Sequence, residues 1–398
     1  MRDARPAVQP WSSRSASPRS RATLSARMGA SPKLTILHVD AEKGFSGGEV
    51  QVFLLMEGLR ARGHRSILAA PPGSAALARA TERGFDVEPV RMRSELDLAA
   101  VSRLQRAIAD RRPDLVHLHT GRATWLGGLA ARLAHVPAIT TRRMDRPVKR
   151  NWRTRLVYGS LVRRAVAIST PVKDCLLAGG VDPAKVDLVF SAVDPAALVP
   201  RYPRELVRAN LATEKDALVL LVLAALVERK GLDVLLGALG VLRERGLEPV
   251  LWVAGDGPAR GALEELARAL ELGPRVRFLG RREDAADLLG ACDAFVLPAR
   301  KEGLGVSALE AMAAGRAVVA SRVGGLAEAV RDDESGLLVP PDDVKALADA
   351  LERVLRDRAL RERLAAGGPR RIAQGFLAEQ MVDAYEKRYR SVLEECRG

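Results

Sequence analysis

Two glutamates, Glu302 and Glu310, bound the pattern in this sequence that is best suited to chemistry. The segment reads Glu302-Gly303-Leu304-Gly305-Val306-Ser307-Ala308-Leu309-Glu310. It follows an expected strand and opens an expected helix, so the backbone N–H groups of residues 304–307 would form an anion site, and the two glycines permit close approach. Carboxylates repel phosphate but accept hydrogen bonds from hydroxyl groups. The pattern therefore predicts binding of a sugar-linked diphosphate, with one carboxylate on either side of it.

A glycine pair and a histidine pair occupy further turns after expected strands. Gly47-Gly48 lies in a glycine-rich turn after residues 34–39. His117 and His119 end the strand expected over residues 114–119. We expect strand alternation to turn the two imidazoles to opposite faces, so that only His119, nearer the carboxyl end, is functional. The remaining histidines, His38, His64 and His135, are interpreted as structural or surface residues.

Apolar runs typical of strands alternate with helical patterns along the chain, and this alternation must position those residues. The first set of expected strands covers residues 34–39, 66–70, 114–119, 138–141 and 166–169. The second set covers residues 218–223, 249–254, 276–279, 294–297, 317–320 and 336–339. Helices are expected between them, including residues 50–62, 231–245 and 259–270. This pattern predicts parallel sheets covered on both faces, with ligands outside the carboxyl ends of the strands.

The alternation stops once and restarts, which predicts two doubly wound α/β domains. We expect an N-terminal domain over residues 32–194, a proline-containing linker over 195–213 and a C-terminal domain over 214–375. A terminal helix over 376–398 is expected to cross back to the N-terminal domain. Residues 1–31 hold six arginines, one aspartate and no hydrophobic period, so we expect a disordered basic extension.

Composition narrows the class of protein and its partners. The 398 residues include 63 basic and 49 acidic side chains, and the resulting net charge of +14 favours an anionic partner. The longest uninterrupted apolar run, residues 217–227, is shorter than the roughly 20 residues of a membrane-spanning helix. Three cysteines without a Cys-x-x-Cys pair indicate neither a disulfide framework nor a zinc site, and favour the cytoplasm.

Together these motifs resemble the retaining glycosyltransferases of family 4, the group 1 glycosyl transferases. The resemblance rests on the Glu302-x7-Glu310 element, on residues 253–258 (VAGDGP) upstream, and on Gly315, the strand 318–321 and Gly324-Gly325 downstream, and it covers residues 33–395. It implies the GT-B fold, in which two Rossmann-like domains face a central cleft. It also implies a nucleotide-sugar donor bound mainly to the second domain and an acceptor bound mainly to the first. No cofactor is implied beyond the donor, which is a substrate.

The resemblance also assigns roles to individual residues. Glu302 would lie against the donor sugar and diphosphate, Glu310 would bind ribose hydroxyls, and His119 would contact the donor sugar. Gly47, Gly48, Gly303, Leu304, Gly305 and Val306 would line the donor site. The family's G-R-x4-K-G stretch, whose basic pair neutralises the diphosphate, corresponds to residues 224–231. Here Lys230 matches the lysine, Ala225 stands at the arginine position, and Arg229 is the candidate for the missing charge.

Two further features bear on metals and partners. The chain contains no Asp-x-Asp pair, so we expect basic residues and helix dipoles, rather than a metal ion, to neutralise the diphosphate.

The stretch Arg142 to Arg164 carries nine basic residues and one aspartate, with Trp152 and Tyr158 among them. This favours peripheral contact with anionic lipid headgroups at the inner face of the cytoplasmic membrane, or with an anionic glycolipid acceptor of the lipopolysaccharide-core kind. The alternative is a solvated basic face; nucleic acid is not expected, because no recognition motif accompanies the charge.

Alternative functions remain open from the sequence alone. A nucleotide-sugar 2-epimerase of GT-B fold would share this architecture and need no acceptor. A non-catalytic sugar-nucleotide-binding protein would explain Ala225 at the arginine position. A Rossmann oxidoreductase is disfavoured, because no G-x-G-x-x-G follows the first expected strand.

Overall fold

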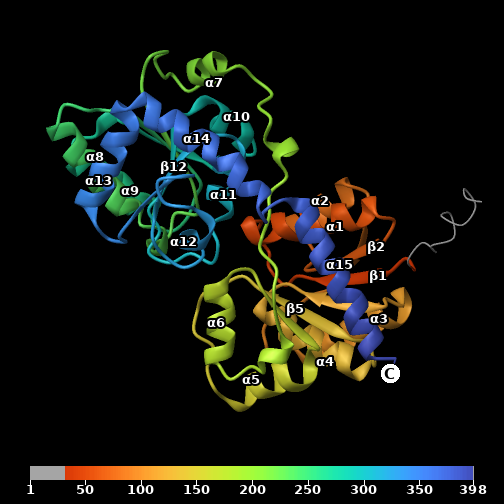
Figure 1. The fold of residues 1–398 in the computed structure, drawn as a ribbon. Helices are drawn as coiled ribbons and strands as arrows, with labels where there is room; N and C mark the ends of the chain where they lie inside the picture. The colour runs from red at the N-terminus through yellow and green to blue at the C-terminus, as the bar shows by residue number, and fades with distance from the viewer. Residues whose placement is uncertain (1–31, 398) are drawn as a thin grey trace, which may run out of the picture. The chain divides into compact units, whose positions relative to one another are not determined.

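Two parallel β-sheets organise the chain in a computed structural model, which describes residues 32–397. The chain from Leu34 onward forms one compact unit (Figure 1). The basic extension expected over residues 1–31 lies outside the described residues. No described helix is long and apolar enough to cross a membrane.

The first sheet has seven strands in the order β3-β2-β1-β4-β5-β6-β7. Its strands are β1 (Thr35–Val39), β2 (Arg65–Ala70), β3 (Asp86–Pro89), β4 (Leu115–Leu118), β5 (Ala138–Arg142), β6 (Arg164–Ala167) and β7 (Val186–Leu188). The helices among them are α1 (Gly47–Ala61), α2 (Ala75–Glu82), α3 (Leu98–Arg111), α4 (Gly121–Leu133), α5 (Trp152–Leu156), the π-helix η2 (Val157–Leu161), α6 (Thr170–Ala178) and the 3-10 turn η3 (Pro183–Lys185).

The second sheet has six strands in the order β10-β9-β8-β11-β12-β13. They are β8 (Val219–Leu223), β9 (Val250–Ala254), β10 (Val276–Gly280), β11 (Ala294–Leu297), β12 (Ala317–Ser321) and β13 (Leu337–Val339). The helices are α8 (Leu232–Glu244), α9 (Arg260–Ala269), α10 (Ala285–Ala291), α11 (Val306–Ala313), α12 (Leu326–Ala329), α13 (Val344–Arg356), α14 (Arg358–Ala373) and α15 (Ala378–Glu395), with 3-10 turns η5 (Glu228–Lys230) and η6 (Gly273–Arg275).

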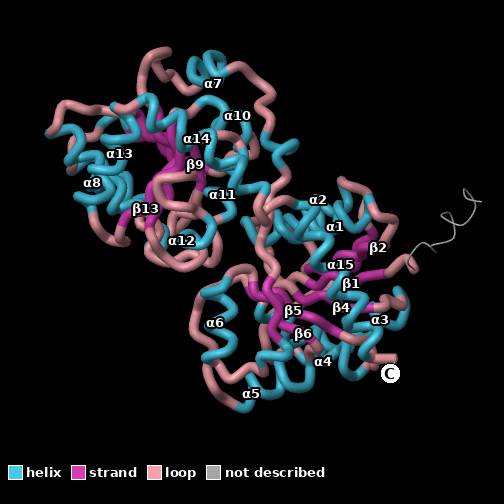
Figure 2. The backbone as a smooth tube through the Cα atoms, in the orientation of Figure 1, coloured by secondary structure: helices cyan, strands magenta, loops and turns pink. Residues whose placement is uncertain are grey.

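Helices cover both faces of each sheet, as Figure 2 shows by the magenta strands between cyan helices. In strand β1, Leu37 packs in the cluster that includes α3 and α4, whereas Ile36 packs with α1 and α15. In strand β8, Leu220 faces α8 and α13, and Leu221 belongs to the cluster that contains α10 and α11. This alternation explains why the strands read as continuous apolar runs, and the prediction of two doubly wound sheets is confirmed.

The strand order reverses once in each sheet, and these reversals mark where ligands bind in doubly wound folds. In the first sheet, β1 and β4 are neighbours with β2 and β5 on their outer sides. In the second sheet, β8 and β11 hold the corresponding positions. The turns after these four strands contain the residues singled out from the sequence.

The segment over residues 195–213 is more regular than expected. It contains the 3-10 turn η4 (Pro195–Leu198) and helix α7 (Arg204–Asn210). The guanidinium groups of Arg204 and Arg208 both pair with Asp293, at 2.6 and 2.7 Å. These ion pairs attach the segment to the second sheet, because Asp293 immediately precedes β11.

Candidate functional site

An ion pair joins two of the residues predicted from the sequence. Lys230 follows β8, Glu302 follows β11, and the ammonium group of Lys230 donates a hydrogen bond to the Glu302 carboxylate. Both side chains are largely buried, at 11% and 12% exposure. The strand reversal in the second sheet therefore brings a cation and an anion together beside the turn that enters α11.

Glycines shape that turn. The sequence suggested that they permit close approach of a ligand, and the structure shows that packing within the protein also requires them. Gly305 adopts a left-handed conformation, with φ of +85°, and caps α11, and a Cβ there would lie 2.4 Å from Leu326. A Cβ on Gly303 would lie 2.4 Å from the main-chain oxygen of Arg143. Packing within the protein thus requires both glycines, whatever approaches from outside.

Helix α11 begins without a side-chain cap among the described residues. Its first backbone N–H groups consequently lack partners within the helix, and the helix dipole adds positive potential at this end. Leu304 and Val306 lie on either side of Gly305 at this helix start. The predicted anion site is therefore adjacent to the Lys230–Glu302 ion pair.

Glu310 lies about one turn inside α11 and is half-buried. Burial raises the pKa of its carboxyl group to about 7. No hydrogen bond or ion pair engages this carboxyl within the part of the chain that the structure describes. A carboxyl group in this environment is suited to accept hydrogen bonds from a ligand's hydroxyl groups.

The residue proposed to replace the missing arginine is not brought to the ion pair. The Arg229 side chain is exposed, and its main-chain oxygen accepts from Arg300 N at 2.9 Å. Ala225 is also exposed. A Cβ on Gly255 would lie 1.8 Å from the oxygen of Ala224, which explains the glycine-containing turn at residues 255–257 that packs against this loop.

The glycine pair of the first sheet begins α1. Ser46 caps the helix, since its hydroxyl accepts from Gly48 N and its own N–H donates to the Glu49 carboxylate at 2.5 Å. Glu49 is therefore a capping residue. Neither Gly47 nor Gly48 has a positive φ, and a Cβ on Gly47 would meet nothing within 4 Å. The protein's own packing does not require glycine at residue 47, so a close-approaching ligand remains a reason for it.

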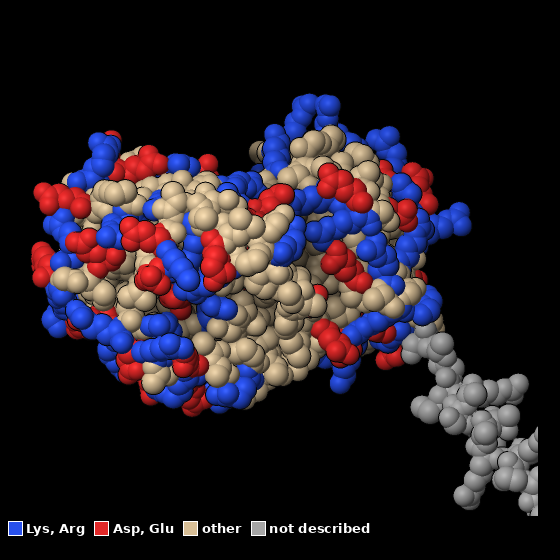
Figure 3. Space-filling view, turned by 90° about the horizontal axis from the view of Figure 1, so that it is seen from above, with Lys and Arg blue, Asp and Glu red and all other residues tan. Residues whose placement is uncertain are grey.

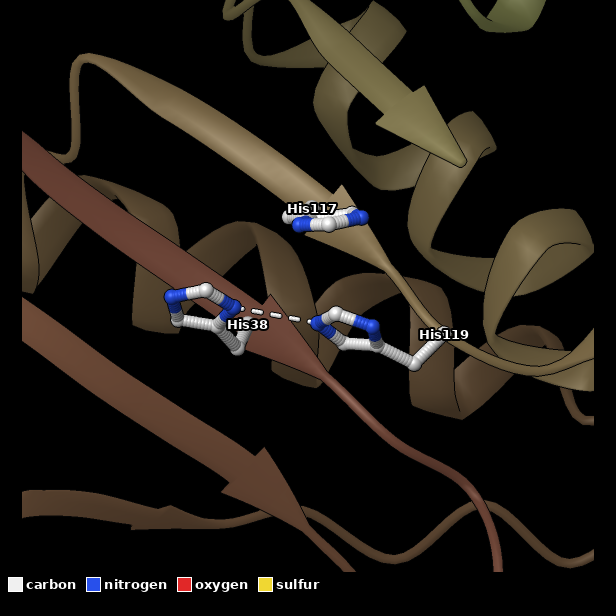
Figure 4. Close-up of side chains that lie close together, drawn as sticks. All are labelled: His38, His117 and His119. Carbon is white, nitrogen blue, oxygen red and sulfur yellow. Dashed lines mark hydrogen bonds between the residues drawn. The ribbon is translucent and has the colours of Figure 1, made fainter. Parts of the chain in front are cut away.

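Three buried histidines meet at the strand reversal of the first sheet (Figure 4). His38 comes from β1, and its Nδ1 lies 3.0 Å from Nε2 of His119, at the end of β4. The rings of His117 and His119 lie 4.0 Å apart, so the expectation that they face opposite sides was wrong. Residues two apart on a strand share a face, because side chains alternate with a period of two. The interpretation of His38 as a structural or surface residue missed this cluster.

Hydrogen bonds define the protonation of the histidine cluster. The Arg143 guanidinium approaches His119 Nδ1 at 3.3 Å and can only donate, so Nε2 of neutral His119 carries the proton and donates to His38. Burial lowers the pKa of His38 to about 3, and it also lowers the pKa values of His117 and His119 well below the usual value. All three imidazoles are therefore neutral at pH 7.

The same three histidines are the side chains best placed to hold a metal ion among those that the structure describes. The nitrogens of His117 are already engaged, with Tyr389 Oη at 2.8 Å and Thr141 Oγ1 at 2.7 Å. The guanidinium of Arg143 would also repel a cation beside His119. Because coordination would displace these contacts, we assign no metal to the cluster.

Arg143 connects the two regions, and reasoning from the sequence placed it only within a basic stretch. Its guanidinium donates to the main-chain oxygen of His119 at 3.1 Å, and its own main-chain oxygen lies against Gly303. Asp40, which follows β1, is buried nearby, and burial raises the pKa of its carboxyl group to about 6. A signal for Arg143 exists in hindsight, since it directly follows strand β5 at the same sheet edge as His119.

The other basic residues between Arg142 and Arg164 divide into two groups. Arg153 pairs with Glu95, and Arg150 Nε donates to the oxygen of Ala178. The side chains of Arg146, Lys149, Arg155 and Arg163 are exposed, as is that of Trp152 at 69%. Because Arg153 and Arg150 already have partners, the stretch is less uniformly available for an anionic partner than its composition indicates. Figure 3 shows the opposite face of the molecule, where basic and acidic side chains are interspersed.

Comparison with known families agrees with this architecture. The model of glycosyl transferases group 1 matches residues 203–371, and that of glycosyltransferase family 4 matches residues 45–197. The chain is 40% identical over 178 residues to the lipopolysaccharide core biosynthesis glycosyltransferase LpsE of Rhizobium meliloti, covering 45% of this chain and 51% of that protein. It thus spans about half the length of this curated relative, and of LpsD from the same organism.

Longer matches extend over both sheets. A D-inositol 3-phosphate glycosyltransferase of Saccharomonospora viridis is 35% identical over 311 residues, which cover 72% of each chain. Among solved structures, a glycosyltransferase from Rickettsia africae has a TM-score of 0.81 at 20% identity, covering 91% of this chain and 99% of that one. HepE of Anabaena, solved with UDP and glucose, has a TM-score of 0.80 at 20% identity, covering 90% and 100%. The chain belongs to the group 1 glycosyltransferases and has their GT-B fold.

Proposed function

We propose that the protein is a retaining, metal-independent glycosyltransferase. It moves a sugar from a nucleotide-sugar donor to a glycolipid or polysaccharide of the cell envelope. The observation that carries the proposal is the Lys230–Glu302 ion pair beside the uncapped start of α11. A cation, a carboxylate and backbone N–H groups without a side-chain cap at one strand reversal suit a sugar diphosphate.

In this proposal each group acts on one part of the donor. Lys230 and the α11 N–H groups hold the diphosphate and stabilise the negative charge that develops as it leaves. Glu302 accepts hydrogen bonds from the donor sugar, and Glu310 accepts them from the ribose. Because the positive charge comes from the protein, no metal ion is needed. The solved complexes of HepE with UDP and with UDP-glucose make UDP-sugars the first donors to test.

His119 has a supporting part in the proposed reaction. Its nitrogens are engaged with His38 and Arg143 and its imidazole is neutral, so it holds neighbouring groups in place and does not remove a proton. The bond between the anomeric carbon and the diphosphate breaks, the acceptor hydroxyl attacks that carbon on the same face, and its proton passes to the departing phosphate oxygen, so the anomeric configuration is retained. Exclusion of water from the closed site would limit hydrolysis of the donor.

The proposed acceptor is anionic and belongs to the envelope. LpsE and LpsD act in lipopolysaccharide core biosynthesis by name, and the exposed basic residues among 142–164 suit phosphorylated sugars or lipid headgroups. We accordingly place the enzyme in the cytoplasm, peripherally at the inner face of the membrane.

A donor panel tests the proposal. The full chain is incubated with UDP-, GDP- and ADP-sugars, and release of the nucleoside diphosphate is measured with and without envelope extract. Release that depends on the extract is the expected result. Interconversion of nucleotide sugars without an acceptor would instead support a 2-epimerase, and tight binding without turnover would support a non-catalytic binding protein.

A further inference from the structure

Arg143 follows β5 in the first sheet; its guanidinium lies against His119, and its main-chain oxygen lies against Gly303 of the second. We propose that the Arg143 guanidinium binds the donor's diphosphate and supplies the positive charge that the group 1 arginine would supply at Ala225. This inference rests on the proposed function and adds a donor-binding residue to it. Lys230 would hold the diphosphate from one side and Arg143 from the other.

The first argument is the position of Arg143 between two glycine turns. Its main-chain oxygen lies 2.4 Å from the place of a Cβ on Gly303, the residue next to Glu302. Its Cδ atom lies 3.6 Å from the place of a Cβ on Gly48, at the start of α1. Arg143 therefore touches both turns whose glycines and helix starts suit a phosphate.

The second argument is that no carboxylate among the described residues forms an ion pair with Arg143. Its guanidinium donates to the main-chain oxygen and Nδ1 of His119, both neutral acceptors, and forms no ion pair with any described residue. Its Nε is buried and donates to no acceptor among the described residues. The Asp40 carboxyl is close enough to feel the charge of Arg143 but does not bond to it, so the guanidinium keeps hydrogen-bonding capacity for a negatively charged ligand.

The third argument is the charge balance around the diphosphate. Lys230 already shares its charge with Glu302, and Ala225 contributes none. The α11 start adds only about half an elementary charge. A diphosphate ester carries more negative charge than these groups offset, and Arg143 is a further cation, whose main-chain oxygen packs against Gly303.

Arg229 is the competing source of the missing charge. It directly precedes Lys230, but its side chain is exposed and makes no hydrogen bond within the described part of the chain. A guanidinium forms forked hydrogen bonds with phosphate oxygens, and Arg143 keeps its Nε–H and a second hydrogen on each Nη for this, whereas the Arg229 side chain is exposed to solvent.

Calorimetric titration tests the assignment. The nucleoside diphosphate that binds tightest among UDP, GDP and ADP is compared with its monophosphate and its nucleoside. The variants are Arg143→Gln, Arg143→Lys, Arg229→Gln and, as the matched control, Arg111→Gln. Arg111 is a partly buried arginine of α3 that also donates to a main-chain oxygen, that of Val87. Thermal unfolding confirms that each variant is folded.

We expect Arg143→Gln to weaken diphosphate binding by about 10- to 100-fold, the scale of a hydrogen bond to a charged group, with much less effect on the nucleoside. Arg143→Lys should retain part of the affinity, and Arg111→Gln all of it. Adding Ala225→Arg to the Arg143→Gln variant should restore most of the loss, because residue 225 is exposed and can accept the longer side chain.

Three results would overturn the proposal. They are diphosphate affinity unchanged in Arg143→Gln, an equal loss for diphosphate and nucleoside, and a diphosphate-specific loss that appears only in Arg229→Gln. A wild-type chain that binds none of the three diphosphates would refute the proposed function itself. That outcome is distinct from a wild-type enzyme that binds and turns over a donor without help from Arg143.

Discussion

The ammonium group of Lys230 and the carboxylate of Glu302 form an ion pair between the turns that follow β8 and β11. The two residues are 72 positions apart in the chain, and the strand reversal of the second sheet makes them neighbours. Each is largely buried, so each depends on the other for charge compensation. A ligand phosphate that attracts Lys230 would free Glu302 to accept hydrogen bonds from the donor sugar.

Replacing either member of the pair should impair the reaction. Lys230→Gln should lower kcat by about 10²- to 10³-fold, the usual cost of removing one preorganised charge from an active site. Glu302→Ala should reduce turnover more than it reduces affinity for the bare nucleotide. Steady-state release of nucleoside diphosphate measures both, with Lys345→Gln as control, since Lys345 is 80% exposed on α13. Wild-type turnover in Lys230→Gln would remove this lysine from the mechanism.

Glu310 predicts a pH dependence of nucleotide binding. Its pKa of about 7 means that the free enzyme loses this proton between about pH 6 and 8, and ribose hydroxyls donate to the ionised form. Affinity for the nucleoside diphosphate should therefore rise with pH across this range and then level off. Glu310→Gln should flatten the profile, and Glu310→Ala should cost about 1.5–3 kcal/mol of binding. An unchanged profile in folded Glu310→Gln would contradict the assignment.

The same carboxyl group has an effect on stability. Its folded-state pKa is raised above the ordinary value of 4.5, so the folded chain binds more protons than the unfolded chain between about pH 4.5 and 7. The Glu310 contribution to the free energy of unfolding should therefore fall as pH rises through this window. Urea unfolding of Glu310→Gln beside wild type should show a smaller decrease, and parallel curves would argue against the raised pKa.

Metal chelation tests the source of charge compensation. If Lys230, Arg143 and the α11 start neutralise the diphosphate, activity should survive EDTA followed by desalting. A sample desalted in the same way without EDTA is the matching control. Strict dependence on added manganese or magnesium would contradict this account of the charges.

Vesicle binding tests the basic stretch. Reversing the exposed residues Arg146, Lys149 and Arg155 to glutamate should abolish sedimentation with anionic vesicles, since each basic charge contributes about 1 kcal/mol near such a surface. Nucleotide affinity should stay the same. The control reverses three exposed cations of α13 and α14, Lys345, Arg353 and Arg358. If the two triple variants bind anionic vesicles equally well, residues 142–164 form an ordinary solvated surface.

The histidine cluster predicts that Tyr389, which is far from it in the sequence, contributes to the free energy of unfolding. Tyr389 of α15 is fully buried, and its hydroxyl lies 2.8 Å from His117 Nδ1. Tyr389→Phe leaves that nitrogen unpaired and should lower the free energy of unfolding by about 1–3 kcal/mol. Urea denaturation measures the loss, with Tyr202→Phe as control, because Tyr202 is 56% exposed. No difference between the two variants would mean that water replaces the hydroxyl.

The sequence predicted the central strands of both sheets and the edge strands β10 and β13 of the second, but neither edge strand of the first. Residues 294–297 form β11 as expected, because a buried parallel strand reads as an unbroken apolar run. Strands β3 and β7 were missed, since β7 has three residues and β3 contains two acidic residues and a proline. Helix α1 begins at Gly47 and not at Val50, which the Ser46–Glu49 capping box explains.

The candidate site was predictable where its residues share one local motif. Glu302, Glu310 and the α11 start lie within nine residues, so their spacing revealed them. His38 and Arg143 could not be found in this way, because their roles depend on which strands are neighbours. Only the pairing of β1 with β4 and of β4 with β5 brings both residues to His119.

Isotope transfer tests the central claim most directly. The best donor is supplied with a ¹³C-labelled sugar and envelope extract, and nucleoside diphosphate release is measured together with label in the acceptor fraction. We predict one labelled sugar incorporated per nucleoside diphosphate released, retention of the donor's anomeric configuration by NMR, and loss of both signals in Lys230→Gln. Label recovered only as free sugar or as an epimerised nucleotide sugar would contradict glycosyl transfer.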